Sequence, residues 1–321
     1  MAFSLENKHI IVKYHYIENP REDRRAFYPC TVDEFERQVI FLKNNFKITT
    51  VDDVFGAAQR EIPEKMCALT FDDGLKDNFE NVVPILKKHG IIGTFFPITK
   101  TFEEFLPATH KMHIALSLQD ADKLVDRFNA FLSVSFPKMV KKILIDKSVR
   151  LTTARKMYDD IAIANLKETM NLIPRNIRDT FLDIVFKENL LDEKEIARSL
   201  FMSLREIKLL KEVGHIVGSH CHSHEALDTM NESCARKEVK ISKEILEKML
   251  GTGITLLAYP QSAPHGNIRS VLEESGFRFA LTTEARGISL GEDPYFIPRY
   301  DTNHIRDFLN SNGEQKNLIE L

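Results

Sequence analysis

The hydrophobic positions in the first part of the chain follow two different periods. Short runs of mostly apolar side chains at residues 10–12, 67–71 and 92–96 predict buried β-strands. Between the first two runs, apolar side chains recur at helical spacing over residues 35–46, and Thr31 with Glu34 forms a capping box before them. Strands that alternate with helices predict an α/β fold with a mainly parallel sheet or barrel.

The pattern changes over residues 101–200, which show helical periodicity and almost no strand signal. The strand–helix alternation resumes near Ser203, where a second capping box begins, and includes a helix predicted over residues 232–250. We therefore expect one α/β barrel domain built from residues 1–100 and 201–321. Residues 101–200 would form a helical insertion within that domain.

Two adjacent carboxylates, Asp72 and Asp73, lie where the strand predicted at residues 67–71 ends in a loop. Ligands of α/β folds bind beyond the carboxyl ends of the strands, and neighbouring residues there point in different directions. One carboxylate could therefore bind a metal while the other faces the reacting water. A solvated Asp-Asp-Gly turn is the alternative.

Three histidines occur within five residues, at positions 220, 222 and 224. A spacing of four predicts that His220 and His224 lie on one side of a helical turn, as two ligands of one metal require. A polar loop with chance histidines is the alternative. Together with one Asp, these two residues leave coordination positions open for water and substrate, and the set suits zinc, cobalt, iron or nickel.

Three segments of the sequence belong together: Thr-Phe-Asp-Asp-Gly at residues 70–74, His-x-x-x-His at 220–224, and Ala-Tyr-Pro at 258–260. As a set they resemble the motifs of the polysaccharide deacetylase (NodB-homology) family. Cys221 stands where the family motif usually has Ser or Thr. Residues 277–283 and 298–301 resemble later family segments more weakly. The resemblance covers roughly residues 8–100 and 200–305, and it implies a distorted (β/α) barrel with fewer than eight regular units.

The resemblance also implies a role for each matching residue. Asp73, His220 and His224 would hold a divalent metal, for which we expect zinc, with cobalt, nickel or iron as alternatives. Asp72 would be the general base that takes a proton from the attacking water. Tyr259 and Pro260 of the third motif, with Gln261 directly after them, would border the substrate, and the Gln261 backbone N–H would stabilise the oxyanion.

The sequence departs from the family pattern in two places. Many members have an Arg in the third motif that orients the catalytic Asp, and none lies near residues 259–261. We expect Arg299 to take over, with a surface ion pair as the alternative. The usual C-terminal catalytic His motif is not intact. We take His265 as the candidate general acid, with His222 and His304 as the alternatives. His15, at the end of a predicted strand, is a further candidate for the site, with a structural histidine as the alternative.

Composition and charge limit the classes of partner that we expect for the chain. The 321 residues carry a formal net charge of −3, which gives no sign of a nucleic-acid partner. We find no signal peptide pattern, no apolar run of about 20 residues, and four scattered cysteines without C-x-x-C spacing. We therefore expect no membrane span and a cytoplasmic location with free thiols.

The predicted function is metal-dependent removal of an N-acyl group, expected to be acetyl, from a sugar or saccharide intermediate. Deformylation, or hydrolysis of another linear amide on an amino sugar, is one alternative. A non-catalytic carbohydrate-binding module is another, although such a module need not keep both aspartates and both motif histidines. We expect the insertion to cover or border the metal site, with His110 and His113 near its start. The alternative is an arm that forms a homo-oligomer.

Overall fold

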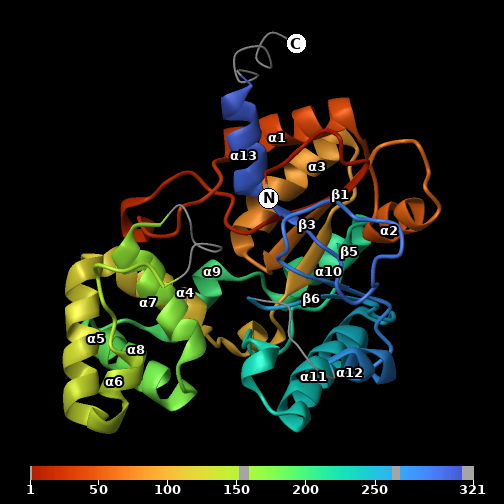
Figure 1. Cartoon of the computed structure of the whole chain (residues 1–321). Coiled ribbons are helices and arrows are strands. Elements are labelled where there is room, and N and C mark those ends of the chain that lie inside the picture. The colour runs from red at the N-terminus through yellow and green to blue at the C-terminus, as the bar shows by residue number, and fades with distance from the viewer. Residues whose placement is uncertain (1, 152–158, 262–267, 313–321) are drawn as a thin grey trace. The chain divides into compact units, whose positions relative to one another are not determined.

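The structure is a computed structural model that describes residues 2–151, 159–261 and 268–312. The chain divides into two compact units. The barrel unit comprises Met1–Asn19, Pro29–Glu103 and Arg198–Leu321. The helical unit comprises Pro20–Tyr28 and Glu104–Ala197. In Figure 1 the N-terminal segments, red to orange, and the C-terminal segments, blue, meet around the strands of the barrel unit.

The strands of the barrel unit pair in parallel. The larger sheet has the order β5-β4-β3-β1-β8, with β2 beside the start of β3, and the smaller sheet pairs β6 with β7. Parallel bridges Ser219↔Leu257 and Leu281↔Ile297 continue the pairing from one sheet to the other. This confirms the expected α/β fold with a parallel sheet. The strands are β1 His9–Tyr14, β2 Lys47–Ile48, β3 Met66–Asp73, β4 Thr94–Pro97, β5 Ile216–Val217, β6 Leu256–Ala258, β7 Phe279–Leu281 and β8 Tyr300–Asp301.

Local sequence signals set the ends of several helices of this unit. The Thr31 hydroxyl accepts the Glu34 backbone N–H at the start of α1, and Ser203 forms the expected capping box with Glu206 at the start of α10. The helices are α1 Val32–Asn45, α2 Val51–Gln59, α3 Val83–His89, α10 Leu204–Glu212, α11 Glu232–Leu250, α12 Ile268–Glu274 and α13 Thr302–Ser311. A π-helical turn, Asn78–Val82, precedes α3, and 3₁₀ turns lie at Thr99–Glu103 and Leu227–Thr229.

The central strand β3 is buried from Cys67 to its end, which explains the nearly continuous apolar run seen in the sequence. The Phe71 ring stacks between Tyr14 of β1 and Phe95 of β4, at centroid distances of 5.5 and 4.7 Å. Burying an aromatic side chain of this size contributes about 1.5–3 kcal/mol. This packing fixes the carboxyl end of β3, where the two aspartates lie.

The helical unit has its own apolar core. Leu124, Phe128, Leu166 and Phe181 pack together there, which matches the periodicity of this part of the sequence. The Asp120 side chain accepts two backbone N–H groups at the start of α5. Its helices are α4 Ala108–Leu118, α5 Ala121–Ser135, α6 Val140–Ile143, α7 Ile161–Leu172 and α8 Arg175–Glu188, with 3₁₀ turns Glu22–Arg24 and Pro137–Met139; α9, Glu193–Leu200, leads back to the barrel unit.

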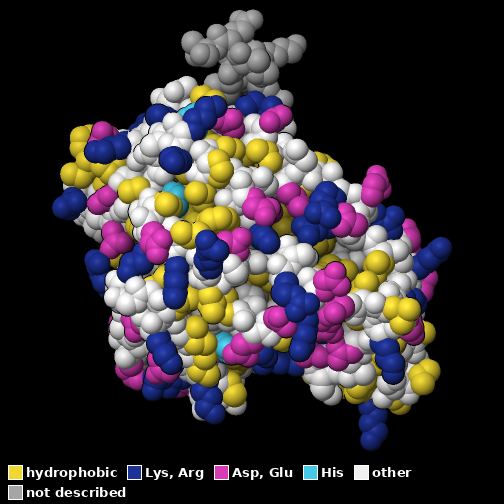
Figure 2. All heavy atoms as spheres, turned by 180° about the vertical axis from the view of Figure 1, so that it is seen from behind, with side chains coloured by type: hydrophobic (Ala, Val, Ile, Leu, Met, Phe, Trp, Pro, Cys, Tyr) yellow, Lys and Arg dark blue, Asp and Glu magenta, His cyan; other side chains and the backbone are white. Residues whose placement is uncertain are grey.

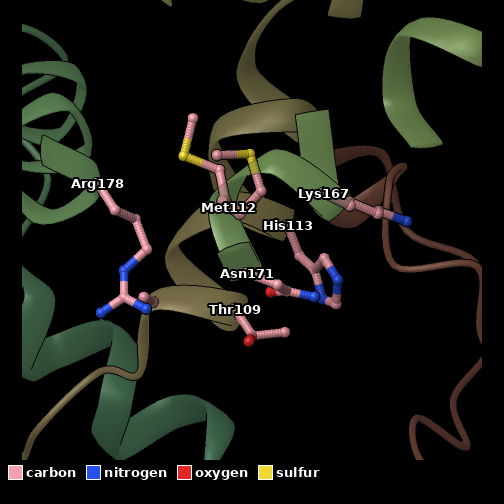
Figure 3. A pocket seen from close by; sticks show the side chains of 8 residues that line it. Thr109, Met112, His113, Lys167, Asn171 and Arg178 are labelled. Atoms are coloured by element: carbon pink, nitrogen blue, oxygen red, sulfur yellow. The ribbon is translucent and has the colours of Figure 1, made fainter. Parts of the chain in front are cut away.

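Figure 3 shows a pocket of the helical unit that includes Met112 and His113 of α4, and Asn171 of α7. Lys167 and Arg178 also line it, and their side chains point to opposite sides. Lys167 pairs with Asp159 at 3.0 Å and Arg178 with Asp179 at 2.8 Å. Because carboxylates of the unit already neutralise both cations, the pocket gives no reason to assign it an anionic ligand.

The surface carries charges of both signs. Figure 2 shows basic and acidic side chains intermingled over the visible face, in keeping with the net charge of −3. In the described part of the chain, no helix combines the length and the apolar character that crossing a membrane requires.

Candidate metal centre

The two aspartates at the end of β3 point in different directions because the chain turns sharply there. Asp73 has a φ of 71°, in the left-handed region, and Gly74 follows with a φ of 71°. A Cβ atom at position 74 would lie 2.8 Å from the Cα of Pro97, so the turn requires glycine both for its φ and for its space. The turn directs Asp73 toward the two motif histidines and leaves Asp72 beside Arg299.

The segment with the two histidines is a loop after β5, so the predicted helical turn is wrong. Cys221 and His224 have φ values of 61° and 63°, which a right-handed helix excludes. The His220 N–H donates to the Pro97 carbonyl at 3.2 Å, and this contact ties the loop to the end of β4. The two imidazoles still converge, but left-handed backbone bends bring them together instead of helical periodicity.

Asp73, His220 and His224 form the group expected to hold a metal. The Asp73 Oδ1 atom lies 3.3 Å from His220 Nε2 and 3.1 Å from His224 Nε2, and all three side chains are buried. One ligand atom from each lies within 4.8 Å of the other two. The His220 Nδ1–H donates to the Ala258 carbonyl at 2.8 Å, so the Nε2 lone pair faces Asp73. One carboxylate and two imidazoles with this orientation fit a divalent cation.

The charge around His220 also favours a cation. Burial by itself lowers the pKa of His220, but the hydrogen bond to Asp73 and the charges of Asp72 and Asp73 outweigh it and raise this pKa above its ordinary value. The three buried side chains therefore attract positive charge, and a proton and a metal ion would compete for the same Nε2 atom.

The second aspartate, Asp72, pairs with Arg299. Both guanidinium Nη atoms donate to the Asp72 carboxylate, each at 2.8 Å, and the Arg299 side chain is 0% exposed. Arg299 Nε also donates to the Thr282 carbonyl at 3.0 Å, and Nη1 to Thr70 Oγ1 at 3.2 Å. The structure thus brings Arg299 to the aspartate that it was expected to orient, and the alternative of a surface ion pair is wrong.

This pairing keeps Asp72 ionised. Burial raises the pKa of Asp72, but the charge and hydrogen bonds of Arg299, with the charge of His220, outweigh burial and lower this pKa to about 2. At neutral pH Asp72 is therefore a fixed carboxylate whose two oxygens are held in one plane by the guanidinium.

The candidate histidines of the site occupy different places. His15 follows β1, and its Nε2 atom lies 3.9 Å from Asp72 Oδ2. Partial burial lowers the pKa of His15, and the carboxylates of Asp73 and Asp72 oppose this change. His222 Nδ1 lies 2.9 Å from Thr99 Oγ1, and His304 Nδ1 accepts the Asp301 N–H in a capping box of α13. His265 lies outside the described residues.

The third motif follows β6 and begins next to the metal ligands. Ala258, whose carbonyl accepts the proton of His220 Nδ1, directly precedes Tyr259. The Tyr259 hydroxyl donates to the Tyr295 carbonyl at 2.9 Å, so this side chain holds the loop in place. Pro260 is buried, and Gln261 has a φ of 63°. The oxyanion role expected of Gln261 stays a prediction.

The structure places at this loop a residue that no sequence pattern had singled out. Glu238 of α11 bonds to the backbone between the two histidines. It was missed because an acidic residue on a predicted amphipathic helix is typical of a solvated face. His110 and His113 belong to α4 of the helical unit, where their rings are 6.2 Å apart. Their expected approach to the metal centre stays a prediction.

Comparisons with known proteins agree with this site. The family model described as polysaccharide deacetylase matches residues 59–280. The Bacillus subtilis (strain 168) protein YxkH, whose name places it among polysaccharide deacetylases, is 34% identical over 84 residues, which are 25% of this chain and 28% of that protein. That match therefore spans little more than a quarter of the relative.

Three solved structures illustrate the fold that this chain shares with known proteins. The Streptococcus pyogenes deacetylase PplD in complex with acetate has a TM-score of 0.58 at 17% identity, over 94% of this chain and 97% of that one. IcaB from Ammonifex degensii has a TM-score of 0.54 at 15% identity, over 92% and 91% of the two chains. A de-N-acetylase from Aggregatibacter actinomycetemcomitans has a TM-score of 0.53 at 13% identity, over 94% and 99%. At these identities the likeness shows the fold, a distorted barrel.

Proposed function

Since the chain belongs to the polysaccharide deacetylase family, we propose that it is a metal-dependent hydrolase that removes an N-acyl group, acetyl in the first instance, from a saccharide. The observation that carries this proposal is the pair of buried groups at one site. Asp73, His220 and His224 offer three ligand atoms, and Asp72 lies beside them as a carboxylate held by Arg299. A binding module would have no use for that ionised carboxylate.

Asp73, His220 and His224 would hold the ion, and zinc is the metal that we propose for this one-carboxylate, two-imidazole set. A divalent ion held there would polarise the amide carbonyl and would lower the pKa of a water molecule. The His220–Ala258 hydrogen bond keeps one imidazole in the tautomer that can bind it.

The chain's own groups would then move the protons. The Asp72 carboxylate takes a proton from the attacking water, and Arg299 keeps its oxygens in place during the transfer. As the amide C–N bond breaks, the leaving nitrogen must gain a proton. The products are a free carboxylate, such as acetate, and an amine that is cationic at neutral pH. The backbone N–H of Gln261, directly after Pro260, is proposed to stabilise the oxyanion.

We propose His15 as the proton donor among the described histidines. Its Nε2 atom is 3.9 Å from the catalytic carboxylate, whereas His222 bonds to Thr99 and His304 caps a helix. When protonated, His15 could pass its Nε2 proton to the leaving amine. His265 remains the other candidate, and separate variants of the two residues distinguish them.

The test is a screen of N-acetylated sugars, including nucleotide-linked and lipid-linked ones, for acetate release with and without added Zn²⁺. We expect release from at least one saccharide, and none after chelation. Release of formate from the N-formyl analogue alone would change the acyl group of the proposal and not the site. Saccharide binding without turnover in the presence of metal would overturn the hydrolase. The cytoplasmic location expected from the sequence stays a prediction.

A further inference from the structure

The loop that presents the two histidines rests on one face of α11. Glu238 and Ser242 are four residues apart on this helix, so they lie on the same face. The Glu238 carboxylate accepts three hydrogen bonds from the loop: the His222 N–H at 3.1 Å, the Ser223 N–H at 2.7 Å, and the Ser223 hydroxyl at 2.7 Å. One carboxylate therefore accepts three hydrogen bonds from His222 and Ser223, two of the three residues between His220 and His224.

Ser242 supports the start of the same loop. Its hydroxyl lies 2.7 Å from the Ser219 hydroxyl, and the Ser219 Oγ atom accepts the Cys221 N–H at 3.1 Å. The opposite side of the loop is tied to the segment after β4, because the Thr99 and Lys100 N–H groups donate to the carbonyls of Cys221 and His222 at 3.3 and 2.9 Å.

These contacts matter because the loop backbone is strained. Cys221 and His224 both adopt left-handed conformations, which cost a non-glycine residue on the order of 1 kcal/mol or more and persist only where surrounding contacts enforce them. Buried backbone N–H groups without a partner are also costly. Without the Glu238 carboxylate, the loop would lose the acceptor for two N–H groups and would relax toward unstrained backbone. Such relaxation would move the His224 imidazole away from Asp73.

We infer that Glu238 is a positioning residue of the metal centre, which sets the affinity of the site for its ion by holding the loop between His220 and His224. The inference rests on the proposed function only in that Asp73, His220 and His224 bind a divalent ion. Cys221 occupies the position where Ser or Thr is usual in the family motif, and its buried thiol is a weak hydrogen-bonding group. The loop consequently depends more on the acceptor supplied by α11.

The experiment measures Zn²⁺ affinity of the full chain by competition with a chelator, together with the thermal midpoint of the metal-free protein. We expect E238A to bind Zn²⁺ about 10–100-fold more weakly, the range found when a group that orients metal ligands is removed. E238Q should lie nearer to wild type, because an amide oxygen can accept both N–H groups and the amide N–H can donate to Ser223 Oγ. The matched control is E244A, on the same helix, whose carboxylate is exposed and paired with Lys240.

Each outcome decides the inference. Wild-type affinity in E238A would overturn it, as would a lower thermal midpoint with unchanged affinity, which would show that Glu238 supports only the fold. If E238A does not fold, S223A removes one of the three hydrogen bonds and should still weaken Zn²⁺ binding; unchanged affinity there would also overturn it. Failure of the wild-type protein to bind Zn²⁺ would instead refute the metal centre itself.

Discussion

Replacing Arg299 with alanine should destabilise the chain in a way that depends on pH. The substitution leaves Asp72 buried without its partner, since Arg299 is 0% exposed and supplies both 2.8 Å bonds to the carboxylate. Breaking a buried pair by removing one member costs about 3–5 kcal/mol. The matched control is R278A, which breaks the exposed pair with Asp52, and about 1 kcal/mol or less is expected there.

The direction of the pH effect follows from the pKa of Asp72. In wild type this pKa is about 2, below the ordinary value of 3.8, so the pairing stabilises the chain above that range. The contribution disappears only as the pH falls from about 4 toward 2. In R299A the remaining effect of burial raises the pKa of Asp72. The buried, unpaired carboxylate therefore lowers the free energy of unfolding of the variant at neutral pH, and this loss becomes smaller as acid protonates Asp72.

Urea unfolding of the metal-free proteins, followed by circular dichroism at pH 7.5 and pH 5, measures this effect. We expect the difference in the free energy of unfolding between wild type and R299A to be larger at pH 7.5 than at pH 5. A difference of less than about 1 kcal/mol at pH 7.5 would refute the reasoning, because it would match an exposed pair. A difference that grows on acidification would refute it as well.

Three further predictions concern activity. D72N should keep its metal but lose about 10²–10⁴-fold in kcat, since an amide cannot accept the proton of the water; near wild-type turnover would show that Asp72 is not the base. H15A should lower kcat by a similar factor at unchanged metal content, whereas H265A should not, and the reverse result would move the acid role to His265. Replacing residues 129–175 with a short Gly/Ser linker should raise KM or change substrate preference if the helical unit borders the site. A change only in oligomeric state would show instead that the unit is an oligomerisation arm.

Much of the fold could be predicted because its signals are local. The cap at Thr31 marked the start of α1, and the apolar spacing between residues 232 and 250 matched α11. The ends of the strands were predicted less well: the strand expected at residues 92–96 is Thr94–Pro97, and the strand expected at residues 67–71 is Met66–Asp73. Strand ends depend on pairing with distant segments, and the apolar pattern does not contain that information.

In the candidate site, too, local features could be predicted and features that depend on distant segments could not. The aspartates could be found because they follow a predicted strand, and the histidines because three of them occur within five residues. The backbone between His220 and His224 could not, because left-handed residues depend on contacts with α11 and with the segment after β4. The pairing of Arg299 with Asp72 joins residues far apart in the chain, and the strand order β3-β1-β8 brings their segments together.

The most direct measurement is a crystal structure of the full chain grown with Zn²⁺, with the ion located by its anomalous signal. We expect one ion bound by Asp73, His220 and His224, with metal–ligand distances of about 2.0–2.2 Å and at least one open position. An ion bound elsewhere, or these three side chains more than about 8 Å apart, would contradict the metal centre on which the proposed hydrolysis depends.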